Sequence, residues 1–247
     1  MKTGIIFCLQ LLTLSACQKS QKVAPTPVVN YPPAQTELES THFEFTYDSL
    51  AKSDFESIKE ALESSYTIIT DRYQVKDIPK IRVVIYSDVE KYNRSHNYMF
   101  NGSSGYVFSR EEIRVLFIGK QTVPNSVHEF THAITLFVSG DFGNNPRWLW
   151  ESVAVYEAGQ LIDPKTLPYM VSKDYPSLQT LSGNVSAPTR VYEVGYTLAE
   201  FIIKTWGYPR MVELIKSHGN VQATLNVSEQ AFEAQWHKYL ETNYLKN

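Results

Sequence analysis

The segment His128-Glu129-Phe130-Thr131-His132 constrains this chain more than any other feature of its sequence. On a helix, positions 128 and 132 lie on one face, so both imidazoles can bind the same metal ion, and zinc accepts such a pair. Glu129 lies one step, roughly 100°, around the helix, which places its carboxylate beside the open coordination position of the metal. There it can take a proton from a water molecule. A catalytic zinc site normally has three protein ligands, so a third is expected elsewhere.

Glu151 is the expected third ligand. A metzincin would instead need a glycine three residues and a histidine six residues beyond the second ligand, where this chain has Thr135 and Val138. Glu151 stands within an apolar run, in which an unpartnered carboxylate would be costly to bury. Residues 133–150 finish one helix, turn, and begin a second helix that runs back alongside the first. We therefore expect a zinc ion between two helices, bound by His128, His132 and Glu151.

These two segments resemble the pattern of the gluzincin metallopeptidases, which is HExxH followed by a glutamate ligand on the next helix. Eighteen residues, numbers 133 to 150, separate His132 from Glu151, as in the aminopeptidase N group. The second motif of that group reads WLNEG, and here it reads Trp148-Leu149-Trp150-Glu151-Ser152. The two departures, Trp150 and Ser152, can alter helix packing but leave the ligand in place. The resemblance implies a zinc metallopeptidase with a peptidase MA-like domain.

Tyr192 is a further candidate for the site. The stretch Val191-Tyr192-Glu193-Val194-Gly195 is similar to the YEKG stretch of the same group, whose tyrosine donates a hydrogen bond to the oxyanion formed during peptide attack. The resemblance implies this role for Tyr192, and an un-ionised phenol near the metal can donate in this way. An ordinary packing role is the alternative, and Tyr196, one helical turn on, is the reserve candidate. Tyr156 and Glu157 either orient a ligand histidine or lie at the solvated end of their helix.

The N-terminus has the features of a bacterial secretory signal. Lys2 precedes an apolar stretch, residues 5–14, that is too short to span a bilayer stably. It ends at Leu14-Ser15-Ala16-Cys17, which resembles the lipobox, in which the cysteine is acylated and becomes the mature N-terminus. An ordinary signal peptide with an incidental cysteine is the alternative. Cys8, the other cysteine of the chain, would be removed with the signal, so no internal disulfide is expected.

The sequence divides into a signal peptide at residues 1–16, a lipidated cysteine with a proline-rich tether at residues 17–40, and one domain at residues 41–247. The tether is too polar to form a core. Acyl chains on Cys17 would anchor the protein in a membrane of the bacterial cell envelope. Gln18 replaces the aspartate of inner-membrane retention signals, which favours the outer membrane, on its periplasmic or surface side. The net charge of −3 predicts no nucleic-acid partner.

Hydrophobic periodicity predicts strands first and helices after them. The expected strands are residues 42–47, 81–86, 105–108 and 113–118, with a helix at residues 53–73 and a hairpin around residues 109–111. The expected later helices are residues 124–139, 146–159, 189–206, 209–218 and 228–244. This order predicts an α+β, zincin-like fold. It would have an N-terminal mixed sheet with helices, an all-helical C-terminal part, and the zinc site between two helices.

Together these features predict a membrane-anchored zinc peptidase that acts on a peptide or protein substrate. Zinc would polarise the scissile carbonyl, Glu129 would act as the general base, and Tyr192 would stabilise the oxyanion. The strand at residues 113–118 is placed like the edge strand along which zincins bind extended substrates. The GxMEN motif of exopeptidases does not occur there, which favours endopeptidase action. The alternative is an anchored binding or assembly protein that keeps a zincin fold without hydrolysing peptides.

Overall fold

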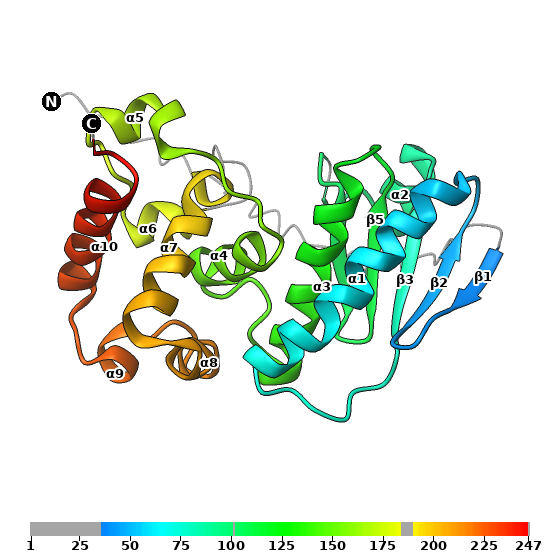
Figure 1. Ribbon diagram of the computed structural model, residues 1–247, viewed down its shortest axis with the longest axis horizontal. Coiled ribbons are helices and arrows are strands. Elements are labelled where there is room, and N and C mark those ends of the chain that lie inside the picture. Colours follow the sequence, from blue (N-terminus) through cyan, green and yellow to red (C-terminus); the bar gives the residue numbers. More distant parts are fainter. Residues whose placement is uncertain (1–35, 101, 184–189, 247) are drawn as a thin grey trace, which may run out of the picture.

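The computed structural model describes residues 36–100, 102–183 and 190–246. In Figure 1, a sheet with helices packed on it lies beside a part made of helices. This arrangement confirms the α+β class and the mixed sheet that the sequence predicts. The expected signal peptide, Cys17 and most of the expected tether lie outside the described residues. Within the described ranges, no helix is both long enough and apolar enough to cross a membrane.

The sheet has five strands in the order β1-β2-β3-β5-β4. β2 (Phe43–Tyr47), β3 (Ile81–Tyr86) and β5 (Glu112–Leu116) are parallel to one another. β1 (Thr36–Glu39) and β4 (Gly105–Ser109) pair antiparallel at the two edges. The expectation that residues 113–118 form the edge strand is therefore wrong. The β4–β5 hairpin inserts β5 next to β3, so β4 is the strand at this edge of the sheet.

The sheet also includes residues that the sequence assigns to the tether. Residues 36–39 form β1, with Thr36 opposite Tyr47 and Glu39 opposite Glu44 of β2. Their sequence, TELE, is short and contains a single large apolar residue, so its periodicity gives no strand signal. Pairing with β2 nevertheless makes the segment a strand. The sheet therefore begins at residue 36, within the stretch that the sequence assigns to the tether.

Helices cover one face of the sheet, where α1 (Lys52–Arg72) and α3 (Thr122–Val138) lie side by side (Figure 1). Alternate residues of the inner strands point into the main core with these helices: Phe43, Phe45, Val83, Ile85, Ile113 and Val115. Val84 and Tyr86 belong to a smaller cluster with Tyr92 of α2 (Val89–Ser95) and Tyr106 of β4. One face of the inner strands is thus buried under α1 and α3, whereas the other face is covered only in part, since Glu44 and Arg82 are exposed. Apolar packing holds α3 against the sheet.

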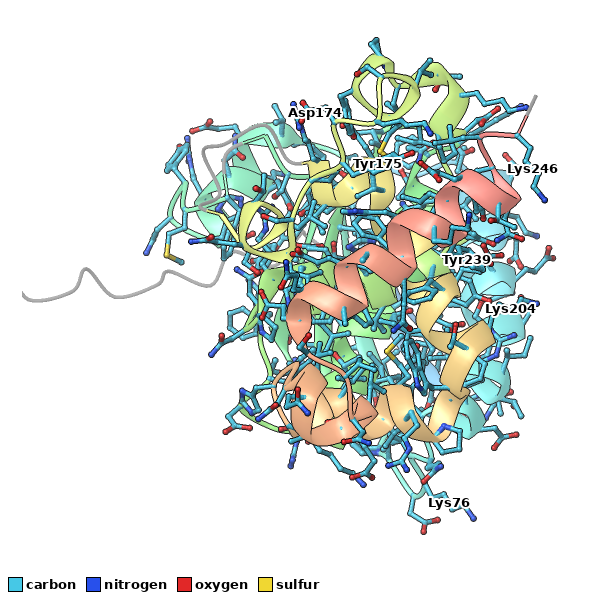
Figure 2. The ribbon with its side chains drawn as sticks, turned by 90° about the vertical axis from the view of Figure 1, so that its left-hand side faces the viewer. Lys76, Asp174, Tyr175, Lys204, Tyr239 and Lys246 are labelled. Atoms are coloured by element: carbon cyan, nitrogen blue, oxygen red, sulfur yellow. The ribbon has the colours of Figure 1, made fainter. Side chains whose placement is uncertain are left out.

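The helical part is built mainly from α4 (Arg147–Glu157), α7 (Arg190–Trp206), α8 (Tyr208–Lys216) and α10 (Glu229–Asn243). Together with α3 these are the predicted later helices, and their ends differ from the prediction by two residues or fewer. The sequence did not predict five short helices of the described chain: α2, η1 (Pro164–Thr166), α5 (Pro168–Val171), α6 (Leu178–Leu181) and α9 (Val221–Leu225). Figure 2 labels Tyr239 on α10. Its hydroxyl donates a hydrogen bond of 3.0 Å to Glu200 of α7, which connects the C-terminal helix to α7.

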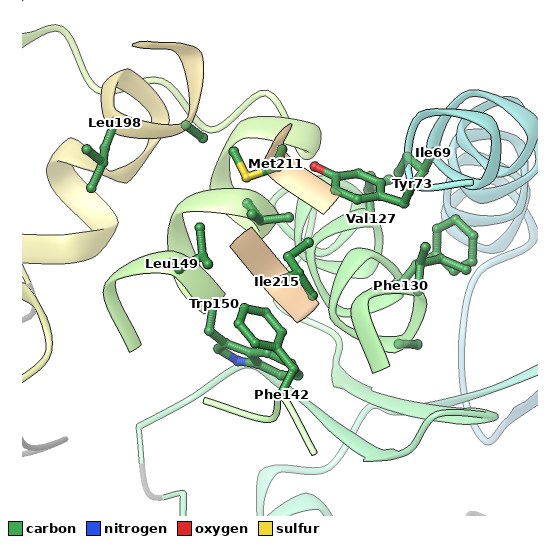
Figure 3. Close-up of a cluster of buried hydrophobic side chains, with 14 of the residues drawn as sticks. Ile69, Tyr73, Val127, Phe130, Phe142, Leu149, Trp150, Leu198, Met211 and Ile215 are labelled. Carbon is green, nitrogen blue, oxygen red and sulfur yellow. The ribbon is translucent and has the colours of Figure 1, made fainter. Parts of the chain in front are cut away.

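One hydrophobic core joins the helical part to the helices on the sheet. Figure 3 shows Met211 and Ile215 of α8 between Leu149 of α4 and the side chains of Tyr73 and Val127. All five side chains are buried. Burial of a large apolar side chain contributes about 1.5–3 kcal/mol, so this junction is a substantial source of stability. It holds α4 in a fixed position relative to α3, and the candidate site lies between these two helices.

Candidate metal site

α3 and α4 bring His128, His132 and Glu151 together. One potential ligand atom from each lies within 4.8 Å of the other two, and all three residues are buried. Oε2 of Glu151 is 3.3 Å from Nε2 of His128 and 3.4 Å from Nε2 of His132. The three residues that the sequence selects as ligands are therefore neighbours in the fold.

These short distances fit either buried ion pairs or a set of metal ligands, and hydrogen-bonding geometry favours the second description. Oε2 of Glu151 is buried and has no hydrogen-bond partner among the described residues, although two imidazole nitrogens are close to it. A carboxylate oxygen left in this way is costly unless a cation compensates it. Tetrahedral zinc with bonds of about 2.0–2.1 Å would separate its ligand atoms by roughly 3.3–3.4 Å. The two separations from Oε2 of Glu151 match this value, so the three side chains form a group that can hold a metal ion of this kind.

The protonation states of Glu151 and His132 also suit a metal. Burial alone would raise the pKa of Glu151, but the two imidazoles outweigh burial and hold that pKa well below its usual range. Burial lowers the pKa of His132 to about 4, although nearby Glu151 opposes this shift. At neutral pH, Glu151 is therefore ionised and His132 is neutral. These are the forms in which the two side chains bind a metal. Burial alone would lower the pKa of His128, but Glu151, Glu129 and Gln160 outweigh burial and raise that pKa, so a metal has to displace a proton from this ring.

His128 is oriented by a chain of side-chain hydrogen bonds. Its Nδ1 lies 2.9 Å from Oε1 of Gln160, and Nε2 of Gln160 donates to Oδ1 of Asn125 at 2.9 Å. Asn125 in turn donates to Oγ of Ser104 at 2.7 Å. Because the amide oxygen of Gln160 can only accept, Nδ1 of His128 carries the proton and Nε2 is left free for a metal. Gln160 could not be predicted from the sequence, because a glutamine beyond the end of α4 belongs to no recognisable motif.

Glu157 and Tyr156 do not orient a ligand histidine. The buried carboxylate of Glu157 accepts hydrogen bonds from Arg72 at 2.5 Å and from the hydroxyls of Tyr73 and Tyr208, both at 3.1 Å. The ring of Tyr156 packs against that of Tyr196, with 4.9 Å between centroids. Glu157 is therefore a structural group that connects α4 to α1 and α8. Of the two alternatives for these residues, orientation of a ligand histidine is wrong for both, and a solvated position is wrong for Glu157, whose side chain is fully buried.

The other oxygen of Glu151 has two polar neighbours. The hydroxyl of Tyr192 donates to Oε1 at 2.9 Å, and Nε of Arg147 lies 3.7 Å from the same atom. Nη2 of Arg147 also donates to the Tyr192 hydroxyl at 3.5 Å. Burial and the charge of Glu151 raise the pKa of Tyr192, so the phenol keeps its proton. Tyr192 thus reaches the site, whereas Tyr196 packs on Tyr156 and does not line the cavity. The sequence analysis did not identify Arg147.

Glu129 lies beside the three candidate ligands, on the wall of the cavity. Its carboxylate makes no hydrogen bond with the residues that the structure describes. Burial raises the pKa of Glu129 to about 7; His128 opposes this shift and Glu151 reinforces it. A carboxyl group with a pKa near neutrality can both accept and release a proton. This is the property that a general base of a hydrolytic reaction requires.

A cavity of about 430 Å³ gives access to these residues. Its walls come from α3, α4, β4 and the segment that precedes β4, and from Tyr192 of α7. Met99 and Phe100 line it although they are 62% and 40% exposed. The cavity is within the size range of small-molecule and peptide side-chain pockets, roughly 300–1,000 Å³. It therefore has room for part of a substrate next to Glu129.

Comparison of the sequence with known protein families found no matching family, and no curated protein matched it. The likeness to gluzincins therefore consists of the short segments around His128, Glu151 and Tyr192.

Proposed function

We propose that this protein is a zinc-dependent peptidase with a zincin-like fold, anchored in a membrane, that hydrolyses internal peptide bonds. One observation carries the proposal. Glu129, a buried carboxyl group with a pKa near 7, lies on a cavity wall beside three residues that fit a zinc ion. This combination of a ligand set and an adjacent proton acceptor is what metal-assisted hydrolysis requires.

Zinc bound at this site would supply a Lewis acid and a more acidic water molecule. The residues of the chain would then handle the protons. Glu129 accepts a proton from the attacking water and delivers it to the leaving amine, which its pKa of about 7 permits. Tyr192 is the residue that the gluzincin resemblance selects as the oxyanion donor, and its un-ionised hydroxyl can fulfil this role. To do so, the hydroxyl has to turn from Oε1 of Glu151 toward the substrate.

β4 supports the binding of an extended peptide. Gly105, Tyr106 and Val107 of this edge strand line the same cavity as Glu129. The outer edge of a strand can pair with a peptide backbone, which gives affinity without fixing the sequence of the peptide. β4 therefore takes the role that the sequence analysis assigned to residues 113–118. Together with the missing GxMEN motif, it favours endopeptidase action on a peptide or protein.

The location of the protein follows from the lipobox resemblance at Cys17. Each buried methylene of an acyl chain contributes about 0.8 kcal/mol, so a multiply acylated cysteine is a durable anchor. We propose that the protein is held in this way in the bacterial cell envelope, with Gln18 favouring the outer membrane. Its substrate would then be a peptide or protein on the periplasmic side or on the outer side of that membrane.

Metal analysis combined with a peptide-library digest tests this function. The purified protein should contain about one zinc ion per chain, as expected for a site with three protein ligands. It should cleave peptides, and a chelator should abolish cleavage until zinc is restored. Glu151→Ala should lose most of the zinc and all cleavage. Zinc bound without any cleavage would instead favour the alternative, an anchored binding or assembly protein. An unchanged zinc content in Glu151→Ala would contradict the assigned ligand set.

A further inference from the structure

The two candidate ligand histidines are held in different ways. Nδ1 of His128 has a hydrogen-bond partner, Oε1 of Gln160, at 2.9 Å. Nδ1 of His132 is also buried, but within the described ranges it has no partner. In metal sites the second ring nitrogen of a ligand histidine almost always donates to an oxygen atom, which fixes the ring orientation. His132 lacks this contact, so another interaction has to fix its ring.

Trp150 makes that interaction. Its indole lies flat against the imidazole of His132, with 4.1 Å between ring centroids and 7° between ring planes. The indole is itself held in place, because Trp150 is buried and packs against Phe142 at 5.5 Å between centroids (Figure 3). Trp150 also directly precedes Glu151 in α4. The helix that carries the carboxylate ligand therefore also carries the surface on which His132 rests.

A second ring restricts His132 from another side. The imidazole of His128 stands nearly perpendicular to it, at 88°, with 4.6 Å between centroids. If the plane of His132 rotated, its ring would lose both the stack on the indole and the perpendicular contact with His128. The observed orientation keeps Nε2 directed at Glu151, 3.4 Å from Oε2. Stacking can therefore replace a hydrogen bond as the device that aims this nitrogen.

We propose that Trp150 is a positioning residue that holds His132 by stacking and thereby sets the zinc affinity of the site. This inference rests on the proposed function, since it takes zinc as the ion bound. Metal binding withdraws electron density from an imidazole and makes the ring more positive. Tryptophan is the aromatic residue that attracts positive charge most strongly, so the stack is stronger with the ion than without it. Such a difference between the two states raises metal affinity.

Three variants of the full-length protein test this role through their zinc dissociation constants, measured by competition with a chelator. Trp150→Leu keeps an apolar side chain but removes the flat ring, and it should weaken zinc binding about 10–100-fold. Trp150→Phe keeps an aromatic face and should recover most of the affinity. Trp148→Leu is the matched control. It removes a buried tryptophan from the same helix, but one whose ring packs against Phe232, 6.1 Å away. It should lower the melting temperature and leave zinc affinity unchanged.

Fluorescence gives a second measurement that does not depend on activity. The chain has 4 tryptophans, and Trp150 is the one stacked on a candidate ligand. Cobalt(II) in the site should quench part of the tryptophan emission, and most of this quenching should disappear in Trp150→Phe.

The outcomes separate this inference from the proposed function. Failure of the unaltered protein to bind zinc or cobalt would overturn the proposed function itself. Normal zinc binding by the unaltered protein and equal affinity in a folded Trp150→Leu variant would overturn only the role of Trp150. If Trp150→Leu does not fold, the fluorescence experiment decides, because unchanged cobalt quenching in Trp150→Phe would contradict the stack.

Discussion

Gly105 of β4 lies directly against the carboxyl group of Glu129: a Cβ atom at position 105 would be 2.5 Å from Oε1 of Glu129. The side chain at position 129 therefore occupies space that exists because position 105 has no side chain. The edge strand on which we place the substrate and the proposed general base are thus in contact. Any side chain at position 105 has to displace the Glu129 carboxylate.

Gly105→Ala should lower peptidase activity while leaving the metal in place. The backbone at Gly105 is not in the left-handed region, so alanine causes no backbone strain, and the flexible end of Glu129 is the group that moves. Misplacement of a catalytic group by about 1 Å can cost about a hundredfold, and we expect a loss of this size in kcat/KM with unchanged zinc content.

Gly143→Ala is the matched control for this experiment. Gly143 lines the same cavity, but a Cβ atom there would have its nearest contact at 3.8 Å, with Cδ2 of Leu136. This variant should keep the activity of the parent. Equal activity of Gly105→Ala and Gly143→Ala would show that the contact between Gly105 and Glu129 has no catalytic consequence.

Tyr192→Phe should lower the rate of hydrolysis by a larger factor than it lowers the affinity for zinc. The loss of one oxyanion donor typically costs about 3 kcal/mol, or about a hundredfold in rate. The hydroxyl also donates to Oε1 of Glu151, but Arg147 remains beside that oxygen in the variant. Zinc affinity should therefore fall by less than about tenfold. Parallel measurement of kcat and of the zinc dissociation constant checks this. Equal losses of kcat and of zinc affinity would mean that Tyr192 positions Glu151 and does not stabilise the oxyanion.

Arg72→Met should destabilise the domain and leave the geometry of the candidate metal site unchanged. The side chain of Glu157 is fully buried, and Arg72 is its charged partner at 2.5 Å. Loss of the charge leaves Tyr73 and Tyr208 as the remaining donors to this carboxylate. Because Arg72 is itself 40% exposed, the expected loss is about 2 kcal/mol in the free energy of unfolding, less than for a fully buried pair. Urea denaturation measures it.

Arg94→Met provides the comparison for Arg72→Met. Its ion pair with Glu90 is exposed on both sides, with side-chain exposures of 53% and 51%. Its removal should leave the unfolding midpoint nearly unchanged. If both variants gave the same midpoint as the parent, the buried contacts of Glu157 would not stabilise the junction between α1, α4 and α8.

Cys17→Ser should release the protein from the membrane. Without the thiol there is no acceptor for the acyl chains, and the described part of the chain has no helix long and apolar enough to cross a membrane. When expressing cells are fractionated, the parent should be found in the membrane fraction and the variant in the soluble fraction. Cys8→Ser is the control, since Cys8 lies in the stretch expected to be removed, and that variant should stay in the membrane. A Cys17→Ser variant that remains membrane-bound with unaltered processing would contradict the lipobox assignment.

The candidate ligands could be found from the sequence because their arrangement is local. His128 and His132 share a face of one helix through their spacing, and Glu151 follows on the next helix after a short turn. The later helices were predicted for the same reason, since a repeating apolar face is visible within a single segment. Each of these features can be recognised from residues that are close together in the sequence.

The supporting residues could not be found in this way, because they meet only in the folded chain. Gln160 reaches His128 across 32 positions. The contact of Gly105 with Glu129 depends on which strand of the hairpin lies at the edge, and the sequence-based prediction chose the wrong strand, residues 113–118. Ser152, the departure from the WLNEG motif, is accommodated by Gly195 of α7, where a Cβ atom would be 3.0 Å from the Cα of Ser152. Contacts of this kind join residues that are far apart in the sequence, so no repeating sequence pattern predicts them.

The most direct test of the account is hydrolysis and zinc binding by Glu129→Gln. Glutamine has nearly the size of glutamate and leaves His128, His132 and Glu151 in place, but its amide cannot accept a proton from water at neutral pH. Cleavage of a peptide that the parent hydrolyses is measured together with the zinc content of both proteins. We predict that the variant keeps its zinc and loses nearly all cleavage. If Glu129→Gln cleaves the peptide as fast as the parent, Glu129 is not the general base and the peptidase mechanism proposed for this site is wrong.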